Sequence, residues 1–497
     1  MKKVLISVFL LLVFSSFAYS ELNIELLGIL EGENNNDYFG DCVANLGDIN
    51  GDGFEDFGVG APHYPERNDT GRVYIYFGGD PMDLEVDMVI DPPAELEFFG
   101  KEICGIDDVN GDGVGEFLVG GIEWFMLGKV FLYFGGEELD DEPDMVFQET
   151  DYYYFGSSLT TGDVNNDGFP DLVSAFGGYA NHMNVYLGSA EMDTIADFIL
   201  IEYQVGLIGM AIGDVNGDGY DDVVADRGYD GTDQSLLYFG RDSLHSEPDV
   251  RFPVAWWKSG VGDVNADGYD DIITDRHLYF GGEEIDTSNY LFLDYALFTA
   301  EVGRVNRDRY GDIITDDHWN FVLDRIFIYL GGDPVDSIYD WASQTRTDNF
   351  GFDIAVVDIN ADGVDEFLVS QVYYPDDLRR GRVYVYGGDT TTTSVSDLVD
   401  LTTPTEVLLH PNYPNPFNSR TVIEFSVSGP RASSSLKICN SRGQLVKTLL
   451  EMPLISGRYH YVWDATNEFG EEVSSGVYFI VLESHDIQKT RKAILMR

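Results

Sequence analysis

The chain has 497 residues, of which 88 are Asp or Glu and only 29 are Lys or Arg, so its formal net charge is −59. Such an acidic chain repels phosphate-bearing surfaces, which argues against nucleic acid or an anionic membrane as its partner. Its three cysteines are too few for the disulfide framework that stabilises many secreted proteins. Cys42 and Cys104 either form one bridge between neighbouring repeats or remain as two buried thiols.

The first twenty residues have the pattern of a secretory signal peptide. Lys2 and Lys3 precede an apolar stretch, and two small residues, Ala18 and Ser20, stand just before the expected cleavage site. We therefore predict that residues 1–20 are removed on export. No other long apolar run follows, so we expect no membrane insertion.

Seven copies of an Asp-x-Asn-x-Asp-Gly-x-x-Asp motif follow, each just ahead of a short apolar run. The copies begin at Asp48, Asp108, Asp163, Asp214, Asp263, Arg304 and Asp358. A period of this length, with apolar runs of strand length, is typical of stacked supersecondary units. Because repeated short strands with Gly-rich turns need radial closure to protect their edges, the pattern favours an all-β propeller.

Six of the seven copies carry alternating oxygen ligands. In the first, the side chains of Asp48, Asn50 and Asp52 can converge, Gly53 allows a sharp turn and Asp56 returns a fourth side chain. Such an all-oxygen cage suits a hard cation, and calcium is the best fit. The predicted ligands are, copy by copy, Asp48, Asn50, Asp52, Asp56; Asp108, Asn110, Asp112, Glu116; Asp163, Asn165, Asp167, Asp171; Asp214, Asn216, Asp218, Asp222; Asp263, Asn265, Asp267, Asp271; and Asp358, Asn360, Asp362, Glu366.

An EF-hand begins with the same residues, but it needs an acidic ligand at its twelfth position and a following helix. The twelfth positions here are Val59, Val119, Ser174, Ala225, Thr274 and Val369. The carboxylate at the ninth position instead opens an apolar strand. A plain Asp/Asn/Gly turn is the remaining alternative, and six copies in register argue against it.

The sixth copy departs from the pattern. Arg304 and Arg309 replace the Asp of the first position and the Gly of the sixth, although Asp308 and Asp312 remain. A guanidinium group at the first position would lie near the place that the cation takes in the other loops. We therefore predict about six calcium sites, and none in the sixth repeat.

Aromatic-Gly pairs stand upstream of several loops, as at Phe39-Gly40 and Phe99-Gly100, and Gly-rich strand ends such as Gly58–Pro62 follow them. This arrangement resembles the FG-GAP repeat family, found in integrin α chains and in many bacterial surface proteins. The resemblance covers residues 21–402. It implies a seven-bladed β-propeller built from four-stranded antiparallel blades, in which each calcium loop joins the first two strands.

In such a blade, the turn between the second and third strands lies on the face opposite to the calcium loop. In the fourth to sixth repeats these turns carry Asp226, Arg227, Asp275, Arg276, His277, Asp316, Asp317, His318 and Trp319. Gathered on one rim, they form a candidate ligand site whose aromatic side chain offers a stacking surface for sugar. The simpler alternative, which we favour, is a set of solvated ion pairs without function.

The composition changes near residue 390, and the calcium motif does not recur in residues 403–497. That segment contains, in order, Asn412 to Asn418, Trp463-Asp464 and Ser475 to Phe479. These anchors resemble the C-terminal sorting domain of type IX secretion substrates, a small immunoglobulin-like β-sandwich. The resemblance implies contact with the type IX secretion machinery and delivery to the outer cell surface or the medium. A generic immunoglobulin-like module that only packs against the propeller is the alternative.

No catalytic site stands out in the sequence. The eight histidines are scattered, and we find no convincing pairing of a nucleophile with a base and no glycine-rich phosphate loop. We therefore predict no catalytic residues and expect a secreted, calcium-stabilised propeller that acts in binding or adhesion, with an unknown carbohydrate or protein as its ligand. The alternatives are an extracellular carbohydrate-active enzyme, a lyase or hydrolase on a propeller scaffold, and a structural envelope component.

Overall fold

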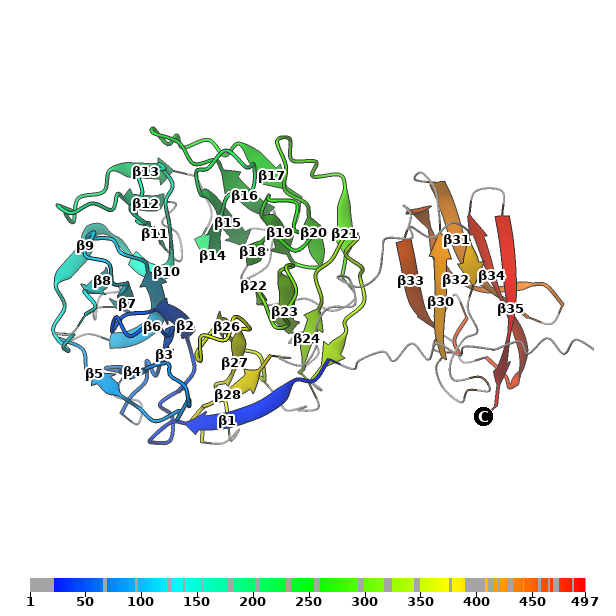
Figure 1. Cartoon of the computed structure of the whole chain (residues 1–497), viewed down its shortest axis with the longest axis horizontal. Helices are drawn as coiled ribbons and strands as arrows, with labels where there is room; N and C mark the ends of the chain where they lie inside the picture. The colour runs from blue at the N-terminus through cyan, green and yellow to red at the C-terminus, as the bar shows by residue number, and fades with distance from the viewer. Residues whose placement is uncertain are drawn as a thin grey trace, which may run out of the picture.

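The computed structural model contains two all-β domains (Figure 1). It describes residues 22–65, 69–93, 97–122, 127–136, 139–153, 155–176, 182–201, 206–228, 234–253, 260–293, 299–316, 324–343, 349–374, 378–388, 407–409, 415, 417, 421–427, 432–440, 442–454, 457–463, 465–467, 473–484 and 487–496. Seven four-stranded sheets are followed by a three-stranded and a four-stranded sheet, which confirms the predicted all-β propeller and β-sandwich. The predicted signal peptide and the predicted boundary at residues 402 and 403 lie outside the described residues.

Each of the first six blades is an antiparallel sheet whose strands follow one another in the chain. The first blade contains β2 (Val43–Gly47), β3 (Asp56–Gly60), β4 (Val73–Tyr76) and β5 (Met88–Ile90). The next five contain β6 (Glu97–Ile106), β7 (Glu116–Ile122), β8 (Leu127–Tyr133) and β9 (Met145–Tyr153); β10 (Phe155–Gly162), β11 (Asp171–Phe176), β12 (His182–Tyr186) and β13 (Phe198–Ile201); β14 (Gly206–Gly213), β15 (Asp222–Gly228), β16 (Gln234–Tyr238) and β17 (Val250–Phe252); β18 (Gly260–Gly262), β19 (Asp271–Thr274), β20 (His277–Tyr279) and β21 (Tyr290–Phe292); and β22 (Ala300–Gly303), β23 (Asp312–Asp316), β24 (Ile326–Tyr329) and β25 (Trp341–Ala342).

The middle strands of a blade are buried on both faces, because each blade packs between two neighbours. All residues of β3 and of β4 are buried. Phe57 on β3 stacks on Tyr76 on β4 with ring centroids 4.7 Å apart, and Phe117 and Tyr133 repeat this pair in the second blade. Burial on both faces explains why these strands are apolar runs with little alternation.

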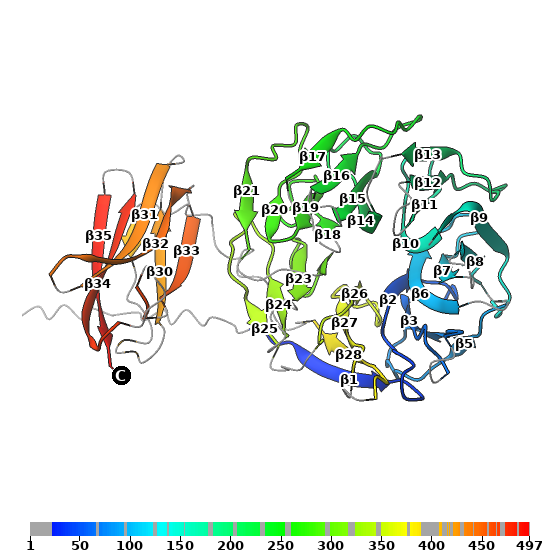
Figure 2. The same cartoon turned by 180° about the vertical axis from the view of Figure 1, so that it is seen from behind.

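The ring closes through its N-terminal strand. The seventh blade contains β26 (Ile354–Val357), β27 (Glu366–Gln371) and β28 (Arg382–Gly387), and its fourth, outer strand is β1 (Glu25–Glu31). Figures 1 and 2 show β1 lying along β28. Leu30 of β1 is buried opposite Val383. Antiparallel pairing between the two ends of the propeller sequence therefore covers β28 and completes the seventh blade, which the repeat pattern alone does not predict.

The Phe-Gly pairs mark the places where one blade contacts the next. Phe99 is fully buried, and the carbonyl of the following Gly100 lies so close to Gly60 of the preceding blade that a Cβ atom on Gly60 would overlap it. Gly71, with a φ of +92°, approaches Phe99 just as closely. The motif therefore encodes close contact between blades on the face opposite to the Asp-rich loops.

We expect Gly60→Ala to destabilise the propeller by about 1–3 kcal/mol, because the new methyl group must displace a backbone carbonyl of the next blade. Gly79→Ala is the matched control, since the atom nearest to a Cβ there is the Pro81 carbonyl oxygen at 3.9 Å. Thermal unfolding in excess calcium measures both variants. Equal unfolding temperatures for the two would contradict the close contact at Gly60.

The second domain packs two sheets face to face. One contains β29 (Leu408–Leu409), β30 (Thr421–Val427) and β33 (Gly457–Trp463), and the other contains β31 (Ala432–Asn440), β32 (Leu445–Leu454), β34 (Gly476–Ser484) and β35 (Ile487–Leu495). Buried residues from both sheets form one core. In it Trp463 lies 5.4 Å from Phe417 and 4.9 Å from Tyr478 between ring centroids, and its indole N–H donates a 2.9 Å hydrogen bond to the Thr466 carbonyl. A core shared by two sheets is the defining feature of a β-sandwich.

The cysteines form no bridge within the described part of the chain. Cys42 is a buried thiol as the second alternative expected, whereas Cys104 is a half-buried one. The Cys42 sulfur accepts a hydrogen bond from the Ile103 N–H across the boundary between the first two blades. In the same part of the chain there is no helix with the length and apolar character to cross a membrane.

Candidate metal centres

The Asp-rich loops join the first and second strands of their blades, as predicted. In the first blade the loop begins after β2 and ends where Asp56 opens β3. The glycine at the sixth position has a positive φ in all six regular loops, between +81° at Gly363 and +94° at Gly113. This left-handed conformation disfavours a side chain, which explains why glycine recurs there. Arg309, at the same position in the sixth blade, does not adopt it.

The carboxylate at the first position organises each regular loop. One oxygen of Asp48 accepts hydrogen bonds from the N–H groups of Gly51 and Asp52, and the other accepts one from Gly53 at 2.8 Å. The bonds from the fifth and sixth residues recur at Asp108, Asp163, Asp214, Asp263 and Asp358. Since a carboxylate oxygen has two lone pairs, the oxygen of Asp48 that accepts only the bond from Gly53 keeps an acceptor site for a cation.

The side chains converge best in the second blade. Asp108, Asp112 and Glu116 each offer a carboxylate oxygen, and these oxygens lie within 4.8 Å of one another. In the seventh blade the side-chain oxygen of Asn360, a predicted ligand, is buried without a hydrogen-bond partner. The carboxylate cluster of the second blade and the unsatisfied amide oxygen of the seventh blade each fit a cation such as calcium.

The carboxylate at the ninth position, a predicted ligand, also accepts hydrogen bonds from two backbone N–H groups, which the motif did not reveal. Asp56 is fully buried, and its two oxygens accept hydrogen bonds from the N–H groups of Ile49 at 3.0 Å and Gly78 at 2.8 Å. The same pair of bonds anchors Asp171, Asp222, Asp271 and Asp312. Asp312 belongs to the degenerate sixth loop, so its anchoring task explains why that loop keeps an acid at the ninth position.

Glutamate takes the ninth position in the second and seventh blades and bonds differently. Glu116 accepts hydrogen bonds from the Val109 N–H and from the side-chain amide of Asn110, each at 2.7 Å. Glu366 repeats this arrangement with Ile359 and Asn360. The longer side chain thus reaches into the loop, toward the predicted ligands, where aspartate reaches only backbone.

Burial changes the acidity of these ninth-position carboxylates. Loss of solvent raises the pKa of Asp56, Asp171, Asp222 and Asp271 to about 7, against the lowering effect of their backbone hydrogen bonds. Burial and the neighbouring loop carboxylates raise the pKa of Glu116 and Glu366 to about 8. Each regular loop thus places a buried carboxylate beside the more exposed carboxylates of the same loop, and a bound divalent cation would relieve the repulsion between them.

Acids at the eighth position connect the loops of neighbouring blades. Glu55 accepts a hydrogen bond from the Asp358 N–H, and Asp221 accepts one from the Asp163 N–H, at 2.9 and 2.8 Å. Asp365 makes the same bond to the Arg304 N–H. Each of these N–H groups belongs to the first residue of the adjacent loop. The motif did not reveal this role, although an acid recurs directly before the ninth position in the sequence.

The sixth loop is lined by arginines. Arg307 reaches across to Asp362, a predicted ligand in the seventh blade, at 3.4 Å. The Arg309 guanidinium lies 4.9 Å from the centre of the Tyr310 ring. These positive charges in and beside the loop disfavour a cation in the sixth blade.

The candidate rim site on the opposite face is only partly visible. Asp226 and Asp316 are fully buried; Asp226 accepts a hydrogen bond from the Ser235 hydroxyl at 2.5 Å, and Asp316 accepts one from the Thr299 N–H at 3.1 Å. Both therefore have structural tasks. Arg276 lies 5.9 Å from the Phe292 ring, His277 packs against Tyr290 and Phe292, and Asp275 lies 3.6 Å from the His277 ring nitrogen. Asp317, His318, Trp319 and the side chain of Arg227 lie outside the described residues, so the rim site stays a prediction.

Protein-family models match residues in both domains of the chain. The FG-GAP repeat matches residues 43–76, and an FG-GAP-like repeat matches residues 163–225. The secretion system C-terminal sorting domain matches residues 412–496.

Individual relatives each match less than a third of the chain. Integrin alpha-5 of Xenopus laevis is 33% identical over 163 residues, which is 29% of this chain and 15% of the relative. The phosphatidylinositol-glycan-specific phospholipase D of Bos taurus is 36% identical over 143 residues, 25% of this chain and 17% of the relative. This chain thus spans less than a fifth of either protein. Among solved structures, PorZ, a surface component of the type IX secretion system of Porphyromonas gingivalis, aligns with a TM-score of 0.37 and 14% identity over 94% of this chain and 60% of PorZ.

Proposed function

We propose that this chain, a propeller with FG-GAP repeats followed by a C-terminal sorting domain, is a calcium-stabilised binding protein of the cell surface or its surroundings. The sorting domain indicates export by the type IX secretion system to the surface or the medium. The observation that carries the calcium part of the proposal is the convergence of Asp108, Asp112 and Glu116 in a loop whose organisation recurs in five other blades.

Calcium would stabilise the loops and the contacts between blades. In each regular loop the side chains at positions one, three, five and nine would hold it, and its charge would offset the crowded carboxylates. The first residue of a loop is also hydrogen bonded to an acid of the next blade, as Asp163 is to Asp221. Ordering one loop therefore stiffens the contact between blades as well as the blade itself.

A stiff ring supports binding through the loops of its other face. Binding residues often lie on loops that a rigid scaffold holds in place. In each blade the Asp-rich loop lies on one face of the ring, and the connection between the second and third strands lies on the other. An unknown carbohydrate or protein is the proposed ligand, and adhesion is the proposed role. A carbohydrate-active enzyme remains the competing proposal, and release of reducing ends from a glycan that the protein binds would favour it.

Calcium stoichiometry tests the proposal directly. We expect isothermal titration of chelator-treated, full-length protein to give about six sites. Asp108→Ala is expected to remove one site, whereas Asp308→Ala, at the fifth position of the sixth loop, is expected to leave the number unchanged. A stoichiometry near zero, or an equal loss in both variants, would contradict the assignment of calcium to the six regular loops.

A further inference from the structure

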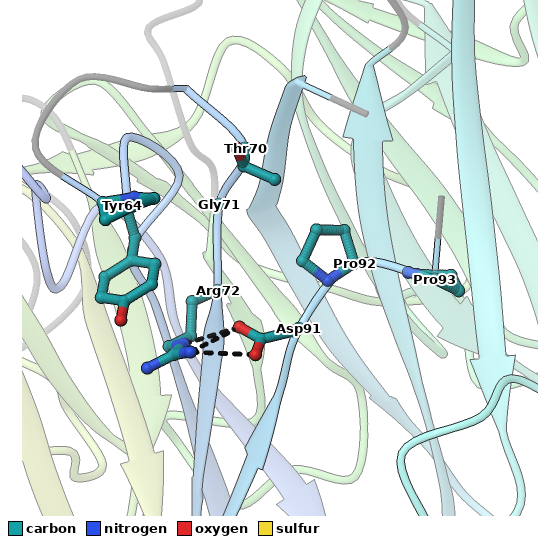
Figure 3. A pocket seen from close by; sticks show the side chains of 8 residues that line it. Tyr64, Thr70, Gly71, Arg72, Asp91, Pro92 and Pro93 are labelled. Carbon is teal, nitrogen blue, oxygen red and sulfur yellow. Dashed lines mark hydrogen bonds and ion pairs between the residues drawn. The ribbon is translucent and has the colours of Figure 1, made fainter. Parts of the chain in front are cut away.

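A groove opens on the first blade, on the face opposite to the Asp-rich loops. It lies between the β3–β4 connection and the segment after β5, and its volume is about 460 Å³. Tyr64 and Pro92 flank it, and Arg72 and Asp91 lie between them (Figure 3). This volume falls in the range of about 300–1,000 Å³ that is usual for small-molecule sites.

The polar groups of the groove are held in place before any ligand arrives. The Arg72 guanidinium donates hydrogen bonds to the two oxygens of Asp91 at 2.7 and 2.9 Å and to Glu33 at 3.3 Å. Its carbon lies 3.9 Å from the centre of the Tyr64 ring. The Arg72 side chain is only 16% exposed, whereas that of Asp91 is 61% exposed. A fixed, planar pair of this kind presents carboxylate oxygens and N–H groups to hydroxyl groups with little loss of conformational entropy.

The walls of the groove are apolar and flat. The Tyr64 ring stands on one side and the pyrrolidine rings of Pro92 and Pro93 on the other. The Arg72 guanidinium already covers one face of the Tyr64 ring, so a pyranose ring would pack its C–H faces on the rest of that ring and on the prolines, while its hydroxyl groups reach the polar floor. The combination of flat apolar walls and a fixed carboxylate–guanidinium pair is suited to a sugar.

A second feature adjoins the groove at His63, the residue before Tyr64. We call it the aromatic ridge, and it consists of Tyr38, His63, Phe98, Tyr373 and Arg379. His63 lies 4.2 Å from Tyr38 and 5.1 Å from Phe98, and the Arg379 guanidinium lies 5.7 and 5.5 Å from the Tyr38 and Tyr373 rings. Tyr38, Phe98 and Arg379 have φ angles of +58°, +55° and +49°. Tyr38 and Phe98 each stand just before a Phe-Gly pair, as Asn349 does with a φ of +60°, so at these two positions the left-handed conformation belongs to the blade repeat.

The negative charge of the domain favours a neutral sugar over an anionic one. The single positive charge of Arg72 is offset by Asp91 and Glu33, and residues 21–402 contain 79 acidic against 17 basic residues. An anionic glycan would be repelled by this domain. We propose that the groove and the aromatic ridge bind a neutral oligosaccharide, with one or two sugar units in the groove and the rest of the chain along the ridge. This inference rests on the proposed binding function and specifies its site and ligand class.

The test is titration of calcium-loaded, full-length protein with neutral hexasaccharides of glucose, xylose and mannose and with an oligogalacturonate. We expect at least one neutral oligosaccharide to bind, and we expect Tyr64→Ala and Asp91→Asn to weaken that binding at least tenfold. Arg382→Met is the matched control. Arg382 lies 3.4 Å from the Tyr374 ring in the seventh blade and pairs with Glu31, which repeats the contacts of Arg72 with Tyr64 and with its acidic partners. Arg382 does not line the groove. It should bind as the wild type does.

Three results would overturn the assignment: no binding of any neutral oligosaccharide, binding of the oligogalacturonate alone, or wild-type binding by both groove variants. Calcium-dependent unfolding of each variant is measured alongside. If calcium stabilises the protein and no neutral glycan binds, the glycan site fails while the calcium-stabilised scaffold stands. If calcium has no effect on unfolding, the proposed function fails independently of the groove.

Discussion

Treatment with a calcium chelator is expected to lower the unfolding temperature of the propeller by about 10 °C or more. Each site that holds calcium at about 100 times its Kd stabilises the folded state by about 2.7 kcal/mol, and several such sites act on one cooperative ring. The physical reason is the crowding of carboxylates in each loop, as with the half-buried Asp108, the exposed Asp112 and the buried Glu116. Differential scanning calorimetry with and without chelator measures the effect.

A pair of loop variants shows whether the shift comes from the loops. Asp108→Ala should shrink the difference between the calcium-loaded and calcium-free unfolding temperatures, whereas Asp308→Ala in the sixth loop should leave that difference as it is in the wild type. A chelator-insensitive unfolding temperature in the wild type would be incompatible with calcium as a structural element of this protein.

The substitution Leu30→Asp is expected to cost about 3 kcal/mol or more and to open the ring to proteolysis. Leu30 is 7% exposed and packs in the core that joins β1 to the first and seventh blades. A charge placed there loses its hydration and weakens the pairing of β1 with β28, which is the only strand pairing in the described residues that joins the two ends of the propeller sequence. Urea unfolding and limited proteolysis in excess calcium measure the loss.

Leu27→Asp is the matched control for ring closure. Leu27 lies on the same strand but is 42% exposed, so a charge at this position remains hydrated. We expect its unfolding free energy to stay within about 0.5 kcal/mol of the wild type. Similar destabilisation by both substitutions would show that β1 is sensitive to any charge, and the role of Leu30 in closure would be wrong.

The sequence by itself determined the repeat architecture. Seven loops in register, each followed by an apolar strand, required a ring of blades, and the glycine at the sixth position required a left-handed turn that Gly53 and its equivalents adopt. The Phe-Gly pairs pointed to the same architecture, and Phe99 is buried at a blade boundary as such a pair requires. These features are local: a periodic pattern or a single backbone conformation carries the information, so it can be read without knowing which blades are neighbours.

Only the tertiary structure decided the tasks that depend on contacts between distant residues. The anchoring of Gly78 by Asp56, the link from Glu55 to Asp358 and the closure of the ring by β1 join segments whose proximity no motif states. The same holds for the groove, because Tyr64, Arg72 and Asp91 come from two connections brought together by the first blade. From the sequence, the acid at the ninth loop position is predicted to be a metal ligand. In the structure its buried oxygens also accept hydrogen bonds from backbone N–H groups, because a buried N–H without an acceptor would destabilise the fold.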